Sequence, residues 1–402
     1  MHAESSGMRL HAFDNLRAVM MWLGIVLHVC VNHFTIPTPL PWRDPQTSVA
    51  ADLLFVFIHA FRMPVFFMIG GYFVAMMIDT RGNEAMVRSR LRRLALPFAV
   101  FWPVLKVGIV CLVLVFLHLM ARGTIGFDLT LRPPADPNRS VLFGTMHMWF
   151  IYYLMIFSLL AAGVSRLEQS LPVRLKDAWH AGWRAMLGNW WGVLLLSVPL
   201  TLAGMQYQGG MVATDGSFIP NAAELLHNGM FFLFGCALYR ERASMLDRFA
   251  RHCWRNLAAG LVSFIVVLKL FGLAKGNGQL ANVNAYLAFT YGITSWLWSI
   301  GLLGLFVRYL SHQNRWLRYV SDSAYWVFLV HMLGTIGFGI LLYNAPLGAL
   351  SKMTVNIVAT TAACLLSYHC FVRTTWVGVL LNGKRRSAVA SVTDSAPERS
   401  HS

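Results

Sequence analysis

The stretch RAVMMWLGIVLH, from Arg17 to His28, places an arginine and a histidine at the ends of ten residues that carry no charge. Uncharged apolar stretches recur along the 402 residues, of which 57% are hydrophobic and only 12% are charged. The mean hydropathy of +0.55 is well above that of ordinary soluble domains. The sequence therefore predicts a polytopic membrane protein.

Ten apolar runs have the length of about 18 to 25 residues that is needed to cross roughly 30 Å of hydrocarbon. They lie near residues 18–36, 50–78, 94–119, 142–162, 187–204, 222–239, 257–274, 285–307, 324–343 and 353–372. All should be helices, because hydrocarbon offers backbone groups no other hydrogen-bond partners. We expect an all-α fold of about ten transmembrane helices, with one integral-membrane domain over 1–376 and a basic, disordered cytoplasmic tail over 377–402.

The distribution of basic residues predicts the orientation in the membrane. With both termini in the cytoplasm, 24 of the 33 Lys and Arg residues fall in cytoplasmic segments, six fall outside and three lie within helices. Topology and attraction to anionic lipid then explain the formal charge of +16. Because this charge is spread over short loops, we do not expect nucleic-acid binding.

The first apolar run and the cysteines add two expectations. The run is long and lacks a small-residue cleavage pattern, so it should remain as an inner-membrane anchor. The six cysteines include no C-x-x-C or zinc spacing. We therefore expect neither a disulfide framework nor a bound metal.

Three ionisable residues are expected deep within the first two helices. His28 lies roughly 16 Å beyond Arg17 along the first helix, near the bilayer centre, and His59 lies at a similar depth in the second. Arg62 follows His59 by three residues and shares its helical face. Ionisable side chains are costly to bury in hydrocarbon, so several of them at one depth indicate a polar chamber. The alternatives are interhelical hydrogen bonding by either histidine, and an arginine that only bridges helix carbonyls.

The stretch RGNEAMVRSRLRRLALP carries five arginines in an expected cytoplasmic loop over 81–93. Positive-inside bias alone can explain such a run. However, Arg90 and Arg93 are one helical turn apart and would present two forked donors on one face, a geometry suited to phosphate groups. A phosphate-rich donor that arrives from the cytoplasm would fit this pattern.

Five motifs in order carry a resemblance to a known family. They are Arg17 with His28, FFMIGGYF near 66–73, RLRRLALP at 90–97, HMWF at 147–150 and SDSAYWVFLVH at 321–331. Together they resemble the acyltransferase-3 family of bacterial membrane proteins over nearly all of the helical region. The segments HAFRMPVFFMIGGYF and HMWFIYYL look closest to its glucan biosynthesis protein C branch, whose members are implicated in adding succinyl groups to periplasmic glucans.

This resemblance implies transfer of an acyl group from cytoplasmic acyl-CoA, succinyl-CoA or acetyl-CoA, to a hydroxyl of a periplasmic glucan or another extracytoplasmic glycan. The family pattern makes Arg17 and His28 the essential pair and places Arg90 and Arg93 beside the donor. The glucan synthesis machinery is a further expected partner. Many relatives have Ser-Gly where this chain has Gly70-Gly71, so no role of that hydroxyl is carried over; the two glycines can instead permit close helix approach.

The chemistry of the residues agrees with this reading. An alcohol attacks a thioester poorly unless a base takes its proton, and histidine is the commonest side chain for that task. We therefore expect His28 to be the general base, with Arg62 or His59 stabilising the developing oxyanion. Arg17 is better placed for the phosphate or pantetheine end of the donor, and Asp14 either holds its guanidinium or caps the helix.

Three further residues are candidates for substrate binding: His147, Trp149 and His331. The alternative for His147 is interfacial hydrogen bonding beside an anchoring Trp149, and for His331 it is helix packing. A secondary transporter of a small anionic or polar solute is the rival function, although the sequence shows neither two related halves nor interrupted helices. A membrane sensor or scaffold would need no donor site. The residues do not distinguish a succinyl from an acetyl donor.

Overall fold

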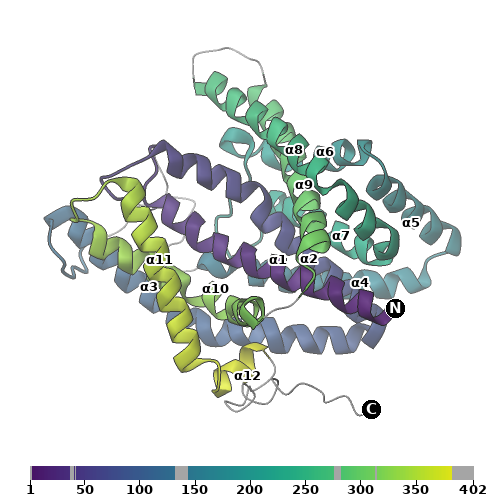
Figure 1. Ribbon diagram of the computed structural model, residues 1–402, viewed down its shortest axis with the longest axis horizontal. Coiled ribbons are helices and arrows are strands. Elements are labelled where there is room, and N and C mark those ends of the chain that lie inside the picture. Colours follow the sequence, from purple (N-terminus) through teal and green to yellow (C-terminus); the bar gives the residue numbers. More distant parts are fainter. Residues whose placement is uncertain are drawn as a thin grey trace, which may run out of the picture.

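The computed structural model describes residues 2–36, 40, 42–131, 144–275, 282–312 and 315–382, and the regular elements in these ranges are all helical (Figure 1). The helices are α1 (His2–Val31), α2 (Val49–Arg90), α3 (Leu96–Arg122), α4 (Trp149–Ser170), α5 (Val173–Gly188), α6 (Trp191–Gly204), α7 (Ala222–Arg240), α8 (Arg242–Lys275), α9 (Val283–Tyr309), α10 (Arg315–Leu342), α11 (Ala349–Phe371) and α12 (Trp376–Asn382). A π-helical turn, Leu91–Ala95, joins α2 to α3, and short 3₁₀ turns lie at Met146–Met148 and Gln208–Gly210. The predicted all-α class is confirmed.

Seven helical segments in the described ranges are long and apolar enough to cross a membrane, and there are eight if the bent pair α5 and α6 counts as one span. One segment, Val49–Arg122, is 74 residues long and contains two of the ten predicted runs. The predicted run at 222–239 forms α7 but is not among these segments, because buried polar residues such as Glu224 and Asn228 lower its hydropathy. The chain is a multi-pass membrane protein.

The expectation of a loop at 81–93 is wrong. Helix α2 continues to Arg90, with one break at Gly82, whose φ of 79° is a conformation that favours glycine. The stretch after this break is rich in strong helix formers, including Glu84, Ala85 and Met86. The arginines of this stretch are consequently held on helical turns.

Helix α1 occupies the centre of the fold. It contacts α2, α9, α10 and α11. In Figure 1 it runs through the middle of the molecule, with α3, α10 and α11 on one side and α6 to α9 on the other. Polar side chains of α1 therefore face other helices, where they can form an internal site.

Close packing of α2 against α7 depends on glycines. A Cβ atom at Gly71 would collide with the backbone of Phe232 on α7, and one at Gly235 on α7 would collide with the backbone of Met68. The expectation of close helix approach is confirmed for Gly71, whereas a Cβ atom at Gly70 would first meet the side chain of Leu154.

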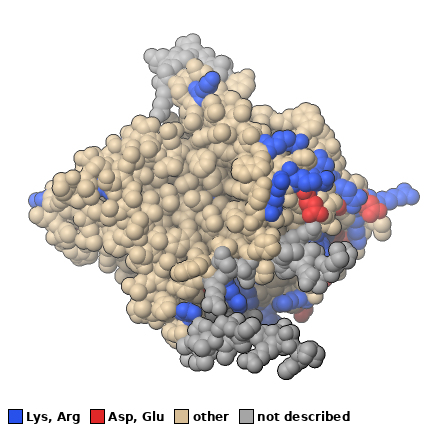
Figure 2. Space-filling view, in the orientation of Figure 1, with Lys and Arg blue, Asp and Glu red and all other residues tan. Residues whose placement is uncertain are grey.

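Charged side chains are distributed unevenly over the surface. Most basic side chains visible in Figure 2 gather on the side where α5 and the N-terminus lie in Figure 1, while the broad middle of this face is uncharged. An uncharged band beside a basic end agrees with a membrane protein whose basic end faces the cytoplasm.

This orientation predicts which cysteines a membrane-impermeant maleimide can reach in intact cells. We chose Ile219, between α6 and α7, and Val173, at the start of α5, which are 82% and 68% exposed. In a background without native cysteines, Ile219→Cys should be labelled from outside, and Val173→Cys should be labelled only after the cells are permeabilised. The opposite pattern would invert the orientation.

Candidate active site

One face of α1 carries both Arg17 and His28, which the sequence singled out. Arg17, Met21, Gly24 and His28 follow one another at intervals of three or four residues and thus share a face. Helix α1 ends at Val31, so His28 lies in its last turn. The predicted run near 18–36 does not stay helical to its end, since the chain leaves the helix for a turn at Asn32.

Three histidines meet at this end of α1. The ring of His28 lies 5.1 Å from that of His331 on α10, which lies 5.3 Å from that of His147 in the turn before α4. His147 and His331 are buried, whereas His28 is partly exposed. The structure therefore brings together the expected base and two of the three residues that the sequence assigned to substrate binding.

Backbone carbonyls fix the tautomers of the two buried histidines. His331 donates through Nδ1 to the carbonyl of Phe328 at 2.8 Å, and His147 donates through Nε2 to the carbonyl of Leu329 at 2.9 Å. The opposite nitrogens, Nε2 of His331 and Nδ1 of His147, have no hydrogen-bond partner among the described residues. A neutral imidazole that donates through one nitrogen accepts through the other. The site thus offers two proton acceptors close to His28.

Arg62 brings an unpaired guanidinium to the same place. Its side chain is only 8% exposed, and its Nη2 atom contacts the sulfur of Met63 at 3.4 Å. Its Nε and Nη1 atoms have no hydrogen-bond partner in the described part of the chain. A buried cation of this kind is costly unless an anion joins it. The expected role of bridging helix carbonyls does not fit this geometry, whereas binding of an anionic or developing negative group does.

His59 belongs to a neighbouring group instead. Its Nδ1 atom forms a hydrogen bond of 2.9 Å with the Tyr291 hydroxyl on α9, and its ring stacks on Phe55 at 5.5 Å. It interacts electrostatically with Arg62 and with His227 on α7. Tyr291 and His227 carry no local signal in the sequence, since only the fold places α7 and α9 beside α2.

Trp149 packs against aromatic rings of the core. Its ring lies 6.2 Å from Phe67 and 5.9 Å from Tyr153. It follows His147 by two residues at the start of α4. Trp149 is thus held by the aromatic packing of the bundle core.

Three arginines gather around Arg17, toward the end of α1 away from His28. The charges of Arg90, Arg93 and Arg17 interact, although they come from α2, the π-helical turn and α1. Asp14 holds Arg17 through an ion pair of 3.1 Å, and the alternative of a helix cap is wrong because α1 begins at His2. Forked cations that converge from separate elements suit phosphate groups.

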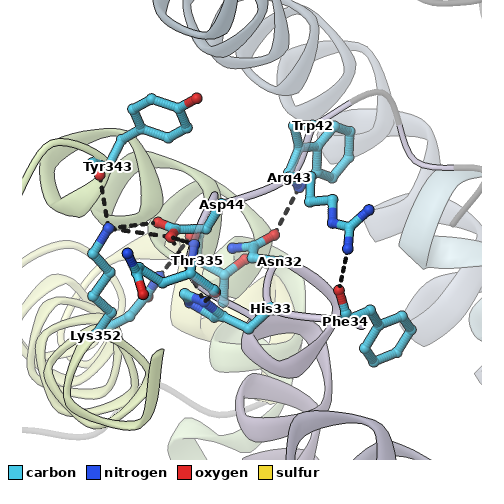
Figure 3. Close-up of polar contacts among 11 residues, drawn as sticks. Asn32, His33, Phe34, Trp42, Arg43, Asp44, Thr335, Tyr343 and Lys352 are labelled. Atoms are coloured by element: carbon cyan, nitrogen blue, oxygen red, sulfur yellow. Dashed lines mark hydrogen bonds and ion pairs between the residues drawn. The ribbon is translucent and has the colours of Figure 1, made fainter. Parts of the chain in front are cut away.

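A buried polar network follows His28 in the chain (Figure 3). Lys352 at the start of α11 donates to both carboxylate oxygens of Asp44, at 3.1 and 3.0 Å, and to the carbonyl of Tyr343 at 2.7 Å. The backbone N–H of Asp44 donates to the carbonyl of Asn32 at 2.9 Å. This network ties the segment after α1 to the turn between α10 and α11, and so fixes the end of α1 that carries His28.

His33 completes the network as a neutral side chain. Its Nδ1 atom donates to the carbonyl of Gln46 at 2.7 Å and lies 4.0 Å from Asp44. Burial lowers the pKa of His33 below its usual value, which favours the neutral imidazole. No local feature of the sequence indicates the Asp44–Lys352 pair, because its partners are 308 residues apart.

Comparison with known proteins identifies the family. The sequence model of an acyltransferase domain, acyltransferase 3, matches residues 10–369. The chain belongs to the acyltransferase-3 family. It is therefore a membrane O-acyltransferase, and the resemblance of its motifs is confirmed. An acyltransferase requires an acyl donor and an acceptor, and the two clusters along α1 are the candidate sites for them.

Curated relatives of this acyltransferase cover nearly its whole length. It is 23% identical over 391 residues to the glucans biosynthesis protein C of Salmonella paratyphi B (strain ATCC BAA-1250 / SPB7), of Salmonella dublin and of Salmonella enteritidis PT4. The similarity covers 94% of this chain and 95% of each relative. No solved structure matches the chain.

The Asp44–Lys352 pair predicts a non-additive effect on stability. Lys352→Met should leave a buried carboxylate without its cation and cost about 3–5 kcal/mol, whereas Asp44→Asn combined with Lys352→Met should recover much of that loss. Thermal unfolding of the acyltransferase in detergent measures both. The control is Arg184→Met, whose side chain is 63% exposed in its pair with Glu241 and should cost about 1 kcal/mol or less. Equal losses in the single and double variants would contradict the role of the pair.

Proposed function

We propose that this acyltransferase of a bacterial inner membrane moves a succinyl or acetyl group from cytoplasmic acyl-CoA to a hydroxyl of a periplasmic glucan or another extracytoplasmic glycan. The observation that supports this proposal is the arrangement along α1. Arginines gather near Arg17, while an unpaired guanidinium and three histidines gather around His28. These are the groups that a phosphate-bearing donor and an acyl transfer require.

The separation of the two clusters suits the shape of acyl-CoA. Arg17 and His28 are eleven residues apart on one helix, which is roughly 16 Å along its axis. The phosphates of the donor would bind Arg17, Arg90 and Arg93, and the pantetheine arm would extend along α1. The thioester would then arrive beside His28 and Arg62.

His28 acts as general base in the proposed reaction. It takes the proton of the acceptor hydroxyl as the oxygen attacks the thioester carbonyl, and the ester C–O bond forms. The C–S bond then breaks, and the CoA thiolate leaves with that proton as free thiol. Arg62 donates to the carbonyl oxygen while this atom carries negative charge. No other reactant is required.

The buried histidines position the acceptor and the base. Nδ1 of His147 and Nε2 of His331 lack hydrogen-bond partners among the described residues, so each could accept a hydrogen bond from a glycan hydroxyl or from the protonated ring of His28. Trp149 would add an aromatic surface beside them. The names of the relatives, glucans biosynthesis protein C, support a glucan as the acceptor.

His28→Ala should reduce acyl transfer by about 10²- to 10⁴-fold, which is the usual contribution of a general base. Membrane insertion should survive, because alanine is easier to bury than imidazole. Acylation of the glycan is measured by mass spectrometry in cells with equal protein levels. The control is His369→Ala, at an exposed position near the end of α11. Transfer at the wild-type rate by folded His28→Ala protein would make this imidazole a packing residue.

Replacement of both Arg90 and Arg93 by alanine should raise the KM for acyl-CoA at least about tenfold and change kcat less, because phosphate contacts far from the reacting carbon contribute uniform binding. Release of free CoA thiol by purified protein measures both constants. Arg92→Ala removes another exposed arginine of the π-helical turn that contains Arg93, and this matched control should keep the wild-type KM. An unchanged KM in the double variant would leave these arginines as topology determinants only.

A further inference from the structure

A fully buried glutamate lies in the first turn of α7, and the proposed reaction does not use it. The oxygens of Glu224 accept from the Tyr153 hydroxyl at 2.9 Å, the Tyr207 hydroxyl at 3.5 Å and the backbone N–H of Asp215 at 3.1 Å, and no cation joins them among the described residues. Asn221 already caps α7 with its own side chain. Because burial of an acidic side chain is costly, Glu224 needs another explanation.

The hydrogen bond to Asp215 anchors a strap, which we define as residues 211–218 between α6 and α7. Gly216, the next residue of the strap, has a φ of 73°, a conformation that favours glycine. Its carbonyl accepts from both the backbone N–H and the hydroxyl of Thr145, at 2.6 and 3.0 Å. The strap therefore connects Glu224 on α7 to Thr145, where the turn before α4 begins.

The turn that the strap holds contains His147 and has an unusual backbone. The carbonyl of Thr145 accepts from the N–H of Met148 at 3.1 Å, which closes the turn. Met146 has a φ of 53°, in the left-handed region that residues with a side chain rarely adopt. Such a conformation persists only where the surrounding contacts enforce it. Because His147 directly follows Met146, the contacts that enforce this backbone also hold the imidazole beside His331.

We propose that Glu224 is a positioning residue for acyl transfer, which acts through the strap to hold the imidazole of His147 beside His331 and His28. This inference rests on the proposed function, in which His147 accepts a hydrogen bond from the glycan or from protonated His28. Glu224 acts by accepting hydrogen bonds from the strap and from two tyrosines, and its charge is not required. Loss of these acceptors frees the strap and, with it, the turn that carries His147.

A double-mutant cycle tests this link. Glu224→Met keeps the length of the side chain but removes both acceptor oxygens. In folded protein its kcat should fall about tenfold, the value of one hydrogen bond to a charged group, while the KM for acyl-CoA should stay within about twofold, because the arginine cluster is unchanged. In a His147→Ala background the same change should cost no further kcat. Release of CoA thiol by purified full-length protein, with periplasmic glucan as acceptor, measures both constants.

Two further variants separate positioning from charge and from general stability. Glu224→Gln keeps one acceptor oxygen and should restore kcat to within about threefold of wild type. Glu168→Met is the matched control, because Glu168 is also a partly buried acid that binds Arg240 at 2.8 Å, but at the end of α4 away from His147. This control should keep the wild-type kcat.

If Glu224→Met does not fold, Thr145→Val gives a milder form of the same test at the other end of the strap. It removes one of the two hydrogen bonds to the carbonyl of Gly216 and keeps the backbone one. Its smaller loss of kcat should also vanish in the His147→Ala background.

Wild-type kcat in folded Glu224→Met protein would overturn the positioning role alone. Equal losses of kcat with and without the His147 imidazole, or a Glu224→Gln protein as slow as Glu224→Met, would do the same. Wild-type protein that releases no CoA thiol, or a His147→Ala protein with wild-type kcat, would instead overturn the proposed function of the donor or of His147, and this inference with it.

Discussion

An arginine buried in a membrane protein without a counter-charge is the constraint on which this site depends. Removing a guanidinium from water costs several kcal/mol, and the protein recovers this cost only if hydrogen bonds or an anion replace the water. Two of the three nitrogens of Arg62 lack such replacement in the described part of the chain. The described residues of the bundle therefore leave this charge without a counter-ion, next to three histidines. An enzyme that stabilises an oxyanion needs this kind of preorganised, incompletely satisfied donor.

The central position of α1 explains how one helix can serve both ends of the reaction. Because α1 contacts helices on both sides of the bundle, the face that carries Arg17, Gly24 and His28 packs against other helices in its buried middle part. That face connects the arginine cluster to the histidine cluster. The buried polar network then fixes the end of α1, since Lys352 and Asp44 hold the segment that follows this helix. A helix held in this way can place His28 against His331 with little freedom to move.

Most of the fold was predictable from the sequence, because the need to satisfy backbone groups in hydrocarbon leaves helices as the solution for long apolar runs. The proximity of Arg90 and Arg93 was also predictable, because residues three apart lie within one helical turn. The helical structure of residues 81–93 was not predicted. Their many charges suggested a loop between two membrane spans, although most of these residues favour helix. The end of α1 at Val31 was not predicted either, because the apolar run near 18–36 continues past the turn at Asn32.

Contacts between distant segments set the limit of prediction at the site. The sequence grouped His59 with His28 by depth, yet rotation about the helix axis and the position of α9 direct His59 to Tyr291. Lys352 looked like an ordinary outer residue, because nothing local indicates a partner 308 residues away. By contrast, His147 and His331 lie in motifs that marked them as candidates in the sequence. Only the contact between them could not be predicted without the structure.

The most direct test of the central claim, that the donor extends along α1 from the arginines to the histidines, is a cryo-electron microscopy structure of this protein with a CoA thioether bound. The account predicts density for the phosphates beside Arg17, Arg90 and Arg93, and for the sulfur beside His28 and Arg62. Phosphate density on another face of the bundle, or a sulfur position away from His28, would contradict it.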